Sequence, residues 1–357
     1  MDNSTYQLED ILRTTLDDKG SDVYIVPGAK VVAKINDVMT PLSEEKLRLA
    51  ECEGLIEQIY EKADHRPMDR LQNEGDDDFS FGLARMGRFR CNAFRQRGTL
   101  AAVLRVVPFQ LPNPKTLSIP DAVLNLSRKK RGMVLVTGPA GSGKTTTLAC
   151  IIDKINEESS GHIITLEDPI EYIHPHKNCL VTQREIMNDT KNFAHALRAS
   201  LRQAPDVILL GEMRDFETIQ TALTASETGH LLLSTLHTIG ASKTIDRIVD
   251  VFPAAQQQQV RVQLSMVLQA VVSQQLIPTL DGVLVPAFEV MIVDSAIANM
   301  IREGKVHQMD NVIYAGASQG MVTMDNDILR LYREKRISRE NALLYAINPD
   351  LLSKRLL

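Results

Sequence analysis

The feature that most constrains the fold of this chain is a glycine-rich loop, "GPAGSGKT" at residues 138–145, set between an apolar run and an amphipathic segment. It matches the pattern G-x-x-x-x-G-K-[ST], and its flanks supply the strand and the helix that the pattern requires. Gly138, Gly141 and Gly143 permit a tight turn whose backbone N–H groups point at phosphate oxygens. The helix after the loop adds partial positive charge at its N-terminus. The loop therefore predicts a nucleotide-phosphate site, with a plain glycine-rich turn before a helix as the alternative.

The same loop predicts ATP and Mg²⁺ as cofactors. Lys144 places a cation on the β- and γ-phosphates, and Thr145 offers a hydroxyl to Mg²⁺. Glu212 ends the apolar run Val207–Leu210, where an acid can orient water on Mg²⁺. Because an Asp directly after the run is the more usual metal-site acid, a solvated strand end is the alternative for Glu212. The residues predicted to hold the phosphates are Gly138, Pro139, Ala140, Gly141, Ser142, Gly143, Lys144, Thr145 and Thr146.

Composition narrows the class of protein. A chain of 357 residues has room for two domains. A net charge of −5 argues weakly against a dedicated nucleic-acid binder. The four cysteines form no C-x-x-C pair, which gives a structural zinc site no support and fits a reducing compartment. No apolar run approaches the roughly 18 residues that span a bilayer, so we expect a cytoplasmic protein whose membrane contact is peripheral.

The order of segments predicts two domains. Residues 1–107 mix amphipathic helical segments with alternating, strand-like ones and predict a small α+β domain. Residues 108–120, "PFQLPNPKTLSIP", hold four prolines and predict a linker. In residues 121–357, the apolar runs "GMVLVTG", "HIITLED", "CLVTQRE", "DVILLGE" and "HLLLSTLHT" alternate with helical patterns and predict an α/β domain with a mainly parallel sheet. The last eighty residues are expected to be mostly helical.

A dense acidic segment follows one of these runs. Residues 164–174 read "ITLEDPIEYIH", with Glu167, Asp168 and Glu171 around Pro169. Proline disfavours helix at the residue before it, so the strand at 162–166 should end and turn there. A carboxylate at the end of such a strand can polarise the water that attacks a phosphate. A merely charged turn is the alternative.

Several ordered motifs together give the chain a family resemblance. They are "GPAGSGKTTT" (138–147), "ITLEDPIEYIH" (164–174), "LRASLRQAPDVILLGEMRD" (197–215), "TALTASETGHLLLSTLHT" (221–238) and "KTIDRIVDVFP" (243–253), with "GRFRCNAFRQRG" before them and "AIANMIREGKVHQM" after them. The chain resembles the secretion-type ATPases over essentially its whole length, and most closely the PilT family of type IV pilus retraction motors.

The resemblance implies an N-terminal PAS-like domain and a RecA-like ATPase domain, assembled as a homo-hexamer that removes pilin from the fibre base. It implies an inner-membrane platform protein (PilC-like) as a partner, a location at the inner face of the cytoplasmic membrane, and work shared with a paralogous pilus ATPase as an open possibility. Extension ATPases of the family carry a longer N-terminal region and a tetracysteine module. Both are absent from this sequence, which favours the retraction branch.

The resemblance also implies roles for single residues. Glu171 corresponds to the catalytic glutamate, Glu212 to the Walker B acid, and His230 and His237 to the family's His box. The arginines implied to reach nucleotide phosphates are Arg90, Arg105, Arg198 and Arg202. Arg198 and Arg202 are four positions apart and are expected on one helix face. Alternatives remain: Arg90 and Arg105 as a solvated face, and His230 as a capping or packing residue.

Two departures keep other functions open. Ala140 replaces the threonine that is usual in the family's loop, and Ala298 in "AIANMIRE" stands where retraction ATPases usually have arginine. The segments "RQAPDV" and "QQLIPTLDG" are also similar to the accessory paralogue PilU. The alternatives are therefore a PilU-like accessory ATPase, an assembly ATPase for type II secretion or DNA uptake, and a nucleotide-responsive structural subunit. A nucleic-acid translocase is disfavoured, and "RKKR" at 128–131 is expected to be a solvated helix end.

Overall fold

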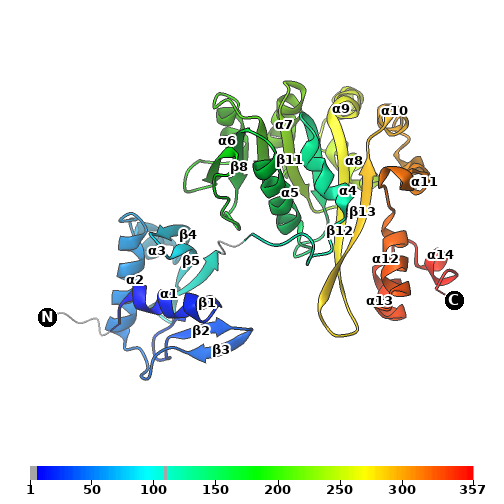
Figure 1. Ribbon diagram of the computed structural model, residues 1–357. Coiled ribbons are helices and arrows are strands. Elements are labelled where there is room, and N and C mark those ends of the chain that lie inside the picture. The colour runs from blue at the N-terminus through cyan, green and yellow to red at the C-terminus, as the bar shows by residue number, and fades with distance from the viewer. Residues whose placement is uncertain (1–5, 108–110, 357) are drawn as a thin grey trace. The chain divides into compact units, whose positions relative to one another are not determined.

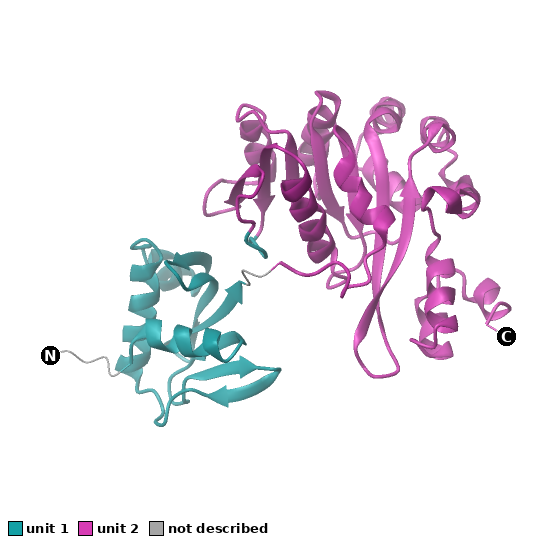
Figure 2. Cartoon of the chain, viewed as in Figure 1, with its two compact units in different colours: residues 1–110, 169–173 teal, residues 111–168, 174–357 magenta. Residues whose placement is uncertain are grey.

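The computed structural model describes residues 6–107 and 111–356. It divides the chain into two compact units (Figure 2). Unit 1 comprises Met1–Gln110 together with the short segment Pro169–Ile173, and unit 2 comprises Leu111–Asp168 and His174–Leu357. Positions 108–110 of the predicted linker lie outside the described residues, and the domain boundaries at 107 and 121 stay predictions.

Unit 1 is an α+β unit, as the sequence predicts. Its sheet is antiparallel throughout, in the order β3-β2-β1-β6-β5-β4. Leu12, Ile56 and Phe89 belong to one buried cluster that joins the helices to the sheet. Its elements are α1 (Leu8–Asp17), β1 (Gly20–Ile25), β2 (Val32–Ile35), β3 (Val38–Pro41), α2 (Leu49–Lys62), α3 (Asp69–Glu74), β4 (Asp76–Leu83), β5 (Gly87–Gln96) and β6 (Thr99–Val107) (Figure 1).

Unit 2 is built on a seven-stranded sheet with the order β13-β12-β7-β11-β10-β8-β9. Every pair in it is parallel except β12 with β13. The five apolar runs of the sequence are its strands β7 to β11, so the predicted fold class is confirmed. The strands are β7 (Gly132–Thr137), β8 (Gly161–Glu167), β9 (Cys179–Glu185), β10 (Val207–Leu210), β11 (Leu231–Leu236), β12 (Leu268–Pro278) and β13 (Leu284–Ile292).

Helices cover both faces of this sheet. Met133 and Leu135 of β7 pack into one buried cluster, whereas Val134 and Val136 pack into another. A strand buried on both faces needs apolar residues at every position, which explains the unbroken run "MVLV". One cluster includes α4 (Asp121–Leu124), η1 (Asn125–Arg128) and α5 (Lys144–Glu158). The other includes α6 (Phe193–Ser200), α7 (Phe216–Glu227), α8 (Ala241–Asp250), α9 (Ala254–Val267), α10 (Ser295–Glu303), η2 (Val306–Gln308) and α11 (Met309–Ala315).

The last eighty residues are mostly helical, as the sequence predicts, but they also contain strand β13. Strands β12 and β13 form a hairpin, and Pro286 is tolerated because β13 is an edge strand. A separate small core joins this hairpin to α12 (Met324–Arg333), α13 (Arg339–Tyr345) and α14 (Pro349–Ser353), with η3 (Gly316–Gln319) just before them. Within the described ranges, no helix combines the length and the apolar character needed to cross a membrane.

Candidate active site

Four neighbouring parallel strands of unit 2 end at one edge of the sheet. Strand β7 runs into the glycine-rich loop, β11 into His237, β10 into Gly211 and Glu212, and β8 ends at Glu167. Because these strands are adjacent and parallel, the residues that follow them share the carboxyl edge, where ligands bind in such sheets. The structure therefore brings the phosphate loop, Glu212 and His237 to one edge of unit 2.

The loop has the close backbone approach that its glycines allow. Gly138 has a φ of +143°, and a Cβ there would lie 2.1 Å from the backbone oxygen of Gln274. Gly143 is left-handed, with a φ of +83°, and precedes the first residue of α5. That first residue is Lys144, which is buried and donates from Nζ to the carbonyl oxygens of Gly138 at 3.0 Å and Pro139 at 2.8 Å. The loop thus curls around an ammonium group at a helix N-terminus.

This arrangement fits a nucleotide phosphate with a magnesium ion. Ser142 Oγ is buried beside Gly138 and, within residues 6–107 and 111–356, has no hydrogen-bond partner. Pro139, Ala140 and Gly141 are exposed, so the turn opens to solvent, and Thr145 is the second residue of α5. The described residues contain no group of three His, Cys, Asp or Glu side chains placed to hold a metal. Mg²⁺ does not need such a group, because it typically keeps water and phosphate ligands.

Glu212 is held more firmly than a solvated strand end. The N–H of Gly211 donates to the oxygen of Leu166 at 2.8 Å, and Thr235 Oγ1 donates to the oxygen of Gly211 at 2.6 Å. The Glu212 carboxylate then lies 2.7 Å from Arg214 Nε and 3.5 Å from His237 Nε2. A contact between the residues that follow β10 and β11 favours the reading of Glu212 and His237 as site residues, and their roles stay predictions.

Arg198 and Arg202 do not lie on one helix face, and that prediction is wrong. Helix α6 ends at Ser200, so only Arg198 is helical. The helix stops because Ala204 has a φ of +50° and Pro205 follows it. Arg198 is exposed and its guanidinium lies 2.6 Å from Glu217 on α7. Both arginines belong to unit 2, and their implied contact with phosphate stays a prediction.

His230 lies at the other edge of the sheet from the phosphate loop. It precedes β11, and its carbonyl accepts from the N–H of Gly132, the first residue of β7. Its Nδ1 lies 3.1 Å from the oxygen of Ala225 and 3.2 Å from Thr228 Oγ1, at the end of α7. Within this chain, therefore, His230 lies away from the phosphate loop, and its contacts favour the alternative that it is a capping or packing residue. "RKKR" spans the end of η1 and the bend before β7, at the same edge.

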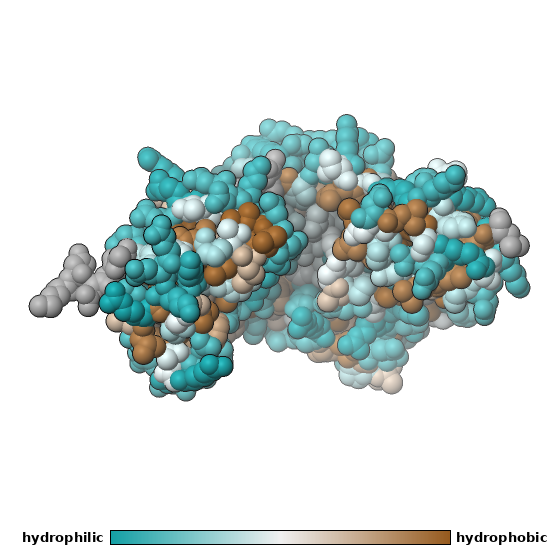
Figure 3. Space-filling view, turned by 90° about the horizontal axis from the view of Figure 1, so that it is seen from below, coloured by the Kyte–Doolittle hydropathy of each residue, from teal (hydrophilic) through white to brown (hydrophobic). Residues whose placement is uncertain are grey.

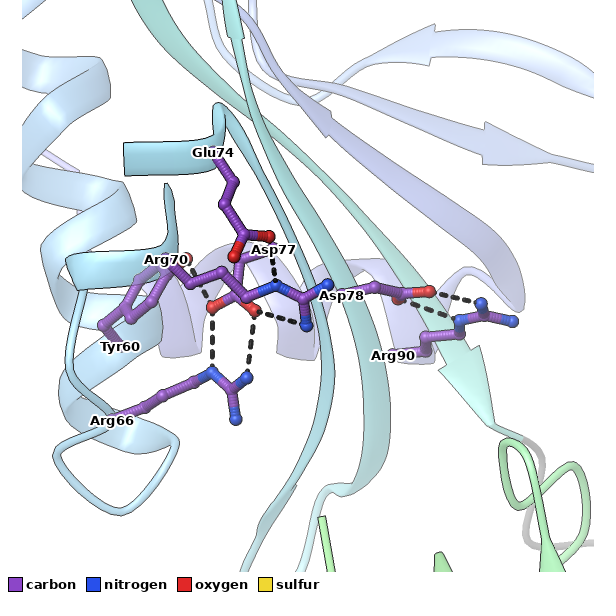
Figure 4. Close-up of polar contacts among 7 residues, drawn as sticks. All are labelled: Tyr60, Arg66, Arg70, Glu74, Asp77, Asp78 and Arg90. Atoms are coloured by element: carbon purple, nitrogen blue, oxygen red, sulfur yellow. Dashed lines mark hydrogen bonds and ion pairs between the residues drawn. The ribbon is translucent and has the colours of Figure 1, made fainter. Parts of the chain in front are cut away.

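Arg90 and Arg105 of unit 1 stand directly opposite each other on β5 and β6. Like charges at such positions repel, so they need anions nearby. Asp78 supplies one, pairing with Arg90 through Nε at 3.1 Å and Nη2 at 2.5 Å (Figure 4). Asp22 supplies another, accepting from Arg105 Nε at 2.9 Å. The two arginines are therefore a concentrated, compensated pair rather than scattered surface charges.

The acidic segment completes this cluster. Arg90 and Arg105 line a pocket of about 310 Å³ together with the segment from Pro169 to Tyr172, which includes Glu171. Glu171 is exposed, whereas Glu167 is buried and accepts from Thr165 Oγ1 at 2.6 Å and Gln183 Nε2 at 3.2 Å. Strand β8 ends at Glu167, directly before Asp168 and Pro169, as the proline predicts. The acids are thus not interchangeable, and Glu171 is the one grouped with both arginines.

Some residues of these sites were not predicted. Asp22 and Asp78 pair with the arginines across the strands of the unit 1 sheet, and Gln274 lies against the phosphate loop. Only the pairing register of distant strands reveals them, because Asp22 and Arg105 are 83 positions apart. No local motif in the sequence marks any of the three.

A phosphate loop on a mainly parallel sheet, with an acid held at the same edge, defines a P-loop nucleotide-binding protein. The family model described as "Type II/IV secretion system protein" matches residues 5–345. The chain belongs to this family.

Two curated relatives and one solved structure narrow the comparison. The chain is 44% identical over 330 residues to the type IV pilus retraction ATPase PilT of Pseudomonas aeruginosa, covering 92% of this chain and 95% of that one. It is 39% identical over 341 residues to the type IV pilus ATPase PilU of the same species, covering 95% and 88%. It is similar to a crystal structure of the pilus retraction motor PilT with bound ADP, at 43% identity and a TM-score of 0.90 over 98% of this chain and 99% of that one.

Proposed function

We propose that this chain is the subunit of a hexameric ATPase motor that hydrolyses ATP to drive type IV pilus retraction, and with it twitching motility. The observation that carries the proposal is the 44% identity with PilT across 92% of the chain. The phosphate loop at the carboxyl edge of β7 supports the ATPase part of the proposal independently of that likeness.

Each site residue has a role in this proposal. Lys144 and the backbone of the loop hold the phosphates, and Thr145 and Glu212 are the residues that would hold Mg²⁺. When bound, Mg²⁺ supplies charge neutralisation on the phosphates. Glu171 orients and polarises the attacking water. The remaining groups, proposed to neutralise charge or to order the site, are Arg90, Arg105, Arg198, Arg202, His230 and His237.

The partners and the domain boundaries belong to the same proposal. Residues 1–107 form a PAS-like domain, 108–120 a linker and 121–357 the ATPase domain. Six copies form the ring, which acts on a platform protein at the inner face of the cytoplasmic membrane. Exposed apolar residues such as Leu344 and Leu351 are available for contacts between proteins, and Figure 3 shows apolar side chains among hydrophilic ones on the face it presents.

The test separates nucleotide binding from turnover. We expect Glu171→Gln to keep ATP binding while lowering turnover by at least about 100-fold, because the amide is a poor base. We expect Lys144→Ala to weaken binding itself. Both are measured by ATP titration and phosphate release on the full chain. Deletion of the gene, complemented with wild type or Glu171→Gln, then scores pilus retraction. Hydrolysis by Glu171→Gln at the wild-type rate contradicts the assigned role of Glu171.

A PilU-like accessory role is the second candidate. Ala298, half-buried on α10, stands where retraction ATPases usually have arginine. Retraction in a strain that lacks every other pilus ATPase separates the two roles, because an accessory subunit alone leaves pili extended. An assembly ATPase of a type II secretion or DNA-uptake system would instead lose secretion or uptake on deletion.

A further inference from the structure

Gln274 lies directly behind the phosphate loop. It follows Ser273, which pairs with Thr137, the last residue of β7 before the loop. Gln274 is buried, and its backbone oxygen is the atom that Gly138 approaches so closely that no Cβ fits. A residue 136 positions away in the sequence is therefore part of the wall of the loop.

The side chain of Gln274 is oriented by the helix that follows the loop. Its Oε1 accepts a hydrogen bond of 2.7 Å from Thr147 Oγ1, a buried contact in the first turn of α5. An amide whose oxygen is engaged in this way has its nitrogen facing the other side. That nitrogen, Nε2, lies 2.9 Å from the place that a Cβ of Gly143 would occupy.

The Nε2 group of Gln274 carries two N–H donors. Of the side chains and backbone groups that the structure describes, none accepts a hydrogen bond from it. Gln274 instead lines a pocket of about 210 Å³ with Gly143, Thr146 and Thr147. The rest of the lining is mainly apolar, but it also includes two hydroxyl side chains and one arginine: Leu117, Ile119, Leu276, Leu284, Val285 and Pro286, with Thr116, Ser118 and Arg336. A largely buried amide donor beside such a pocket calls for a polar partner from a ligand.

The position of the pocket indicates which part of a nucleotide it receives. Lys144 Nζ points back at the carbonyls of Gly138 and Pro139, into the loop where the terminal phosphates belong. The pocket lies instead along Gly143, Thr146 and Thr147, with mainly apolar walls that suit a sugar and a base better than phosphates.

We infer that Gln274 is a nucleotide-binding residue whose N–H₂ group donates to the sugar of the bound nucleotide, while Thr147 holds the amide in that orientation. This inference rests on the proposed function, because it assumes that the loop binds a nucleotide. A residue of β12, the strand paired with β7, would then distinguish a nucleotide from its phosphate part alone.

The experiment compares a nucleotide with its phosphate part alone. ADP and inorganic tripolyphosphate are titrated by calorimetry into the full chain, as wild type, Gln274→Leu and Gln274→Glu. We expect Gln274→Leu to weaken ADP about tenfold, the worth of one hydrogen bond, and tripolyphosphate by less than about twofold. Gln274→Glu is nearly isosteric and keeps the acceptor for Thr147. We expect it to weaken ADP as well, because it lacks the donor.

Gln275→Leu is the matched control. Gln275 is the next residue of the same strand and equally buried, but its Nε2 donates to the oxygen of Tyr345 at 3.1 Å. We expect it to leave both ligands unchanged, and Lys144→Ala to weaken both. Equal weakening of ADP and tripolyphosphate by Gln274→Leu overturns the inference, because Gln274 would then act only through the loop. Unchanged binding of both ligands overturns it too. Wild type that binds no ADP would instead refute the proposed function.

Discussion

The close approach at Gly138 yields the sharpest structural prediction, for Gly138→Ala. A Cβ at this position would lie 2.1 Å from the oxygen of Gln274 and 2.7 Å from Ser142 Oγ. Real Cβ contacts are essentially never under 3.0 Å, so the oxygen would have to retreat by about 0.9 Å. It belongs to the β12 backbone, which is paired to β7 just before the loop. The loop, rather than the strand, should therefore be displaced.

The expected cost has two parts. Overpacking typically costs about 1–3 kcal/mol, and a non-glycine residue at a φ of +143° costs about 1–3 kcal/mol more. Together they predict a loss of about 4 kcal/mol in the free energy of unfolding. Because the displaced N–H groups no longer point at the phosphates, we also expect ADP affinity to fall by at least about 100-fold.

Gly141→Ala is the matched control, because Gly141 has a φ of +75° but nothing within 4 Å of its Cβ position. Only the backbone term of about 1 kcal/mol applies there. We would measure unfolding by calorimetry and ADP binding by titration for both variants. If Gly138→Ala binds ADP within about threefold of wild type, or if Gly141→Ala loses as much as Gly138→Ala, the steric reasoning is wrong.

Two stability predictions concern neighbouring acids and a buried histidine. Asp77 is fully buried and accepts hydrogen bonds from Arg66 and Tyr60 (Figure 4), so we expect Asp77→Asn to lower the free energy of unfolding by about 3 kcal/mol. Asp78 is exposed and pairs with Arg90, so Asp78→Asn should lower it by less than about 1 kcal/mol. Equal losses of the two variants in calorimetry would contradict this prediction. Burial lowers the pKa of His174 from 6.5 to about 4. The unfolded chain therefore binds a proton that the folded chain refuses, and stability should fall by about 2 kcal/mol as the pH drops from 7.5 to 5. Urea unfolding should show this loss in wild type but not in His174→Gln, and equal losses would contradict it.

The sequence predicted the sheet of unit 2 because burial on both faces leaves a simple signature. Unbroken apolar runs ending in polar residues identified β7 to β11, and the parallel arrangement then placed Glu212 beside the phosphate loop. The sequence did not predict strand β12, for two physical reasons. It begins directly after α9, with no turn residue between them, and it buries polar residues such as Ser273 and Gln274. They are tolerated because both form hydrogen bonds in the folded chain: Ser273 Oγ accepts from the N–H of Gly240, and Gln274 Oε1 accepts from Thr147 Oγ1.

The arginine sites show the same limit. That Arg90 and Arg105 face each other depends on the register of β5 with β6, which the connecting turn sets. Their carboxylate partners come from β4 and β1. The end of α6 depends on the left-handed backbone of Ala204. The residue type does not predict this backbone, because alanine is a strong helix former. Long-range pairing and local strain are therefore the parts of the site that pattern reasoning could not supply.

The residues to which the proposed function gives roles in hydrolysis are divided between the two units. Two opposed guanidiniums repel, and a phosphate would add negative charge where that repulsion is concentrated. Glu171 lines the same pocket of unit 1, whereas Lys144 and the loop belong to unit 2. Under the proposed function, the glutamate that activates water and the lysine that holds the phosphates therefore belong to different units of the chain.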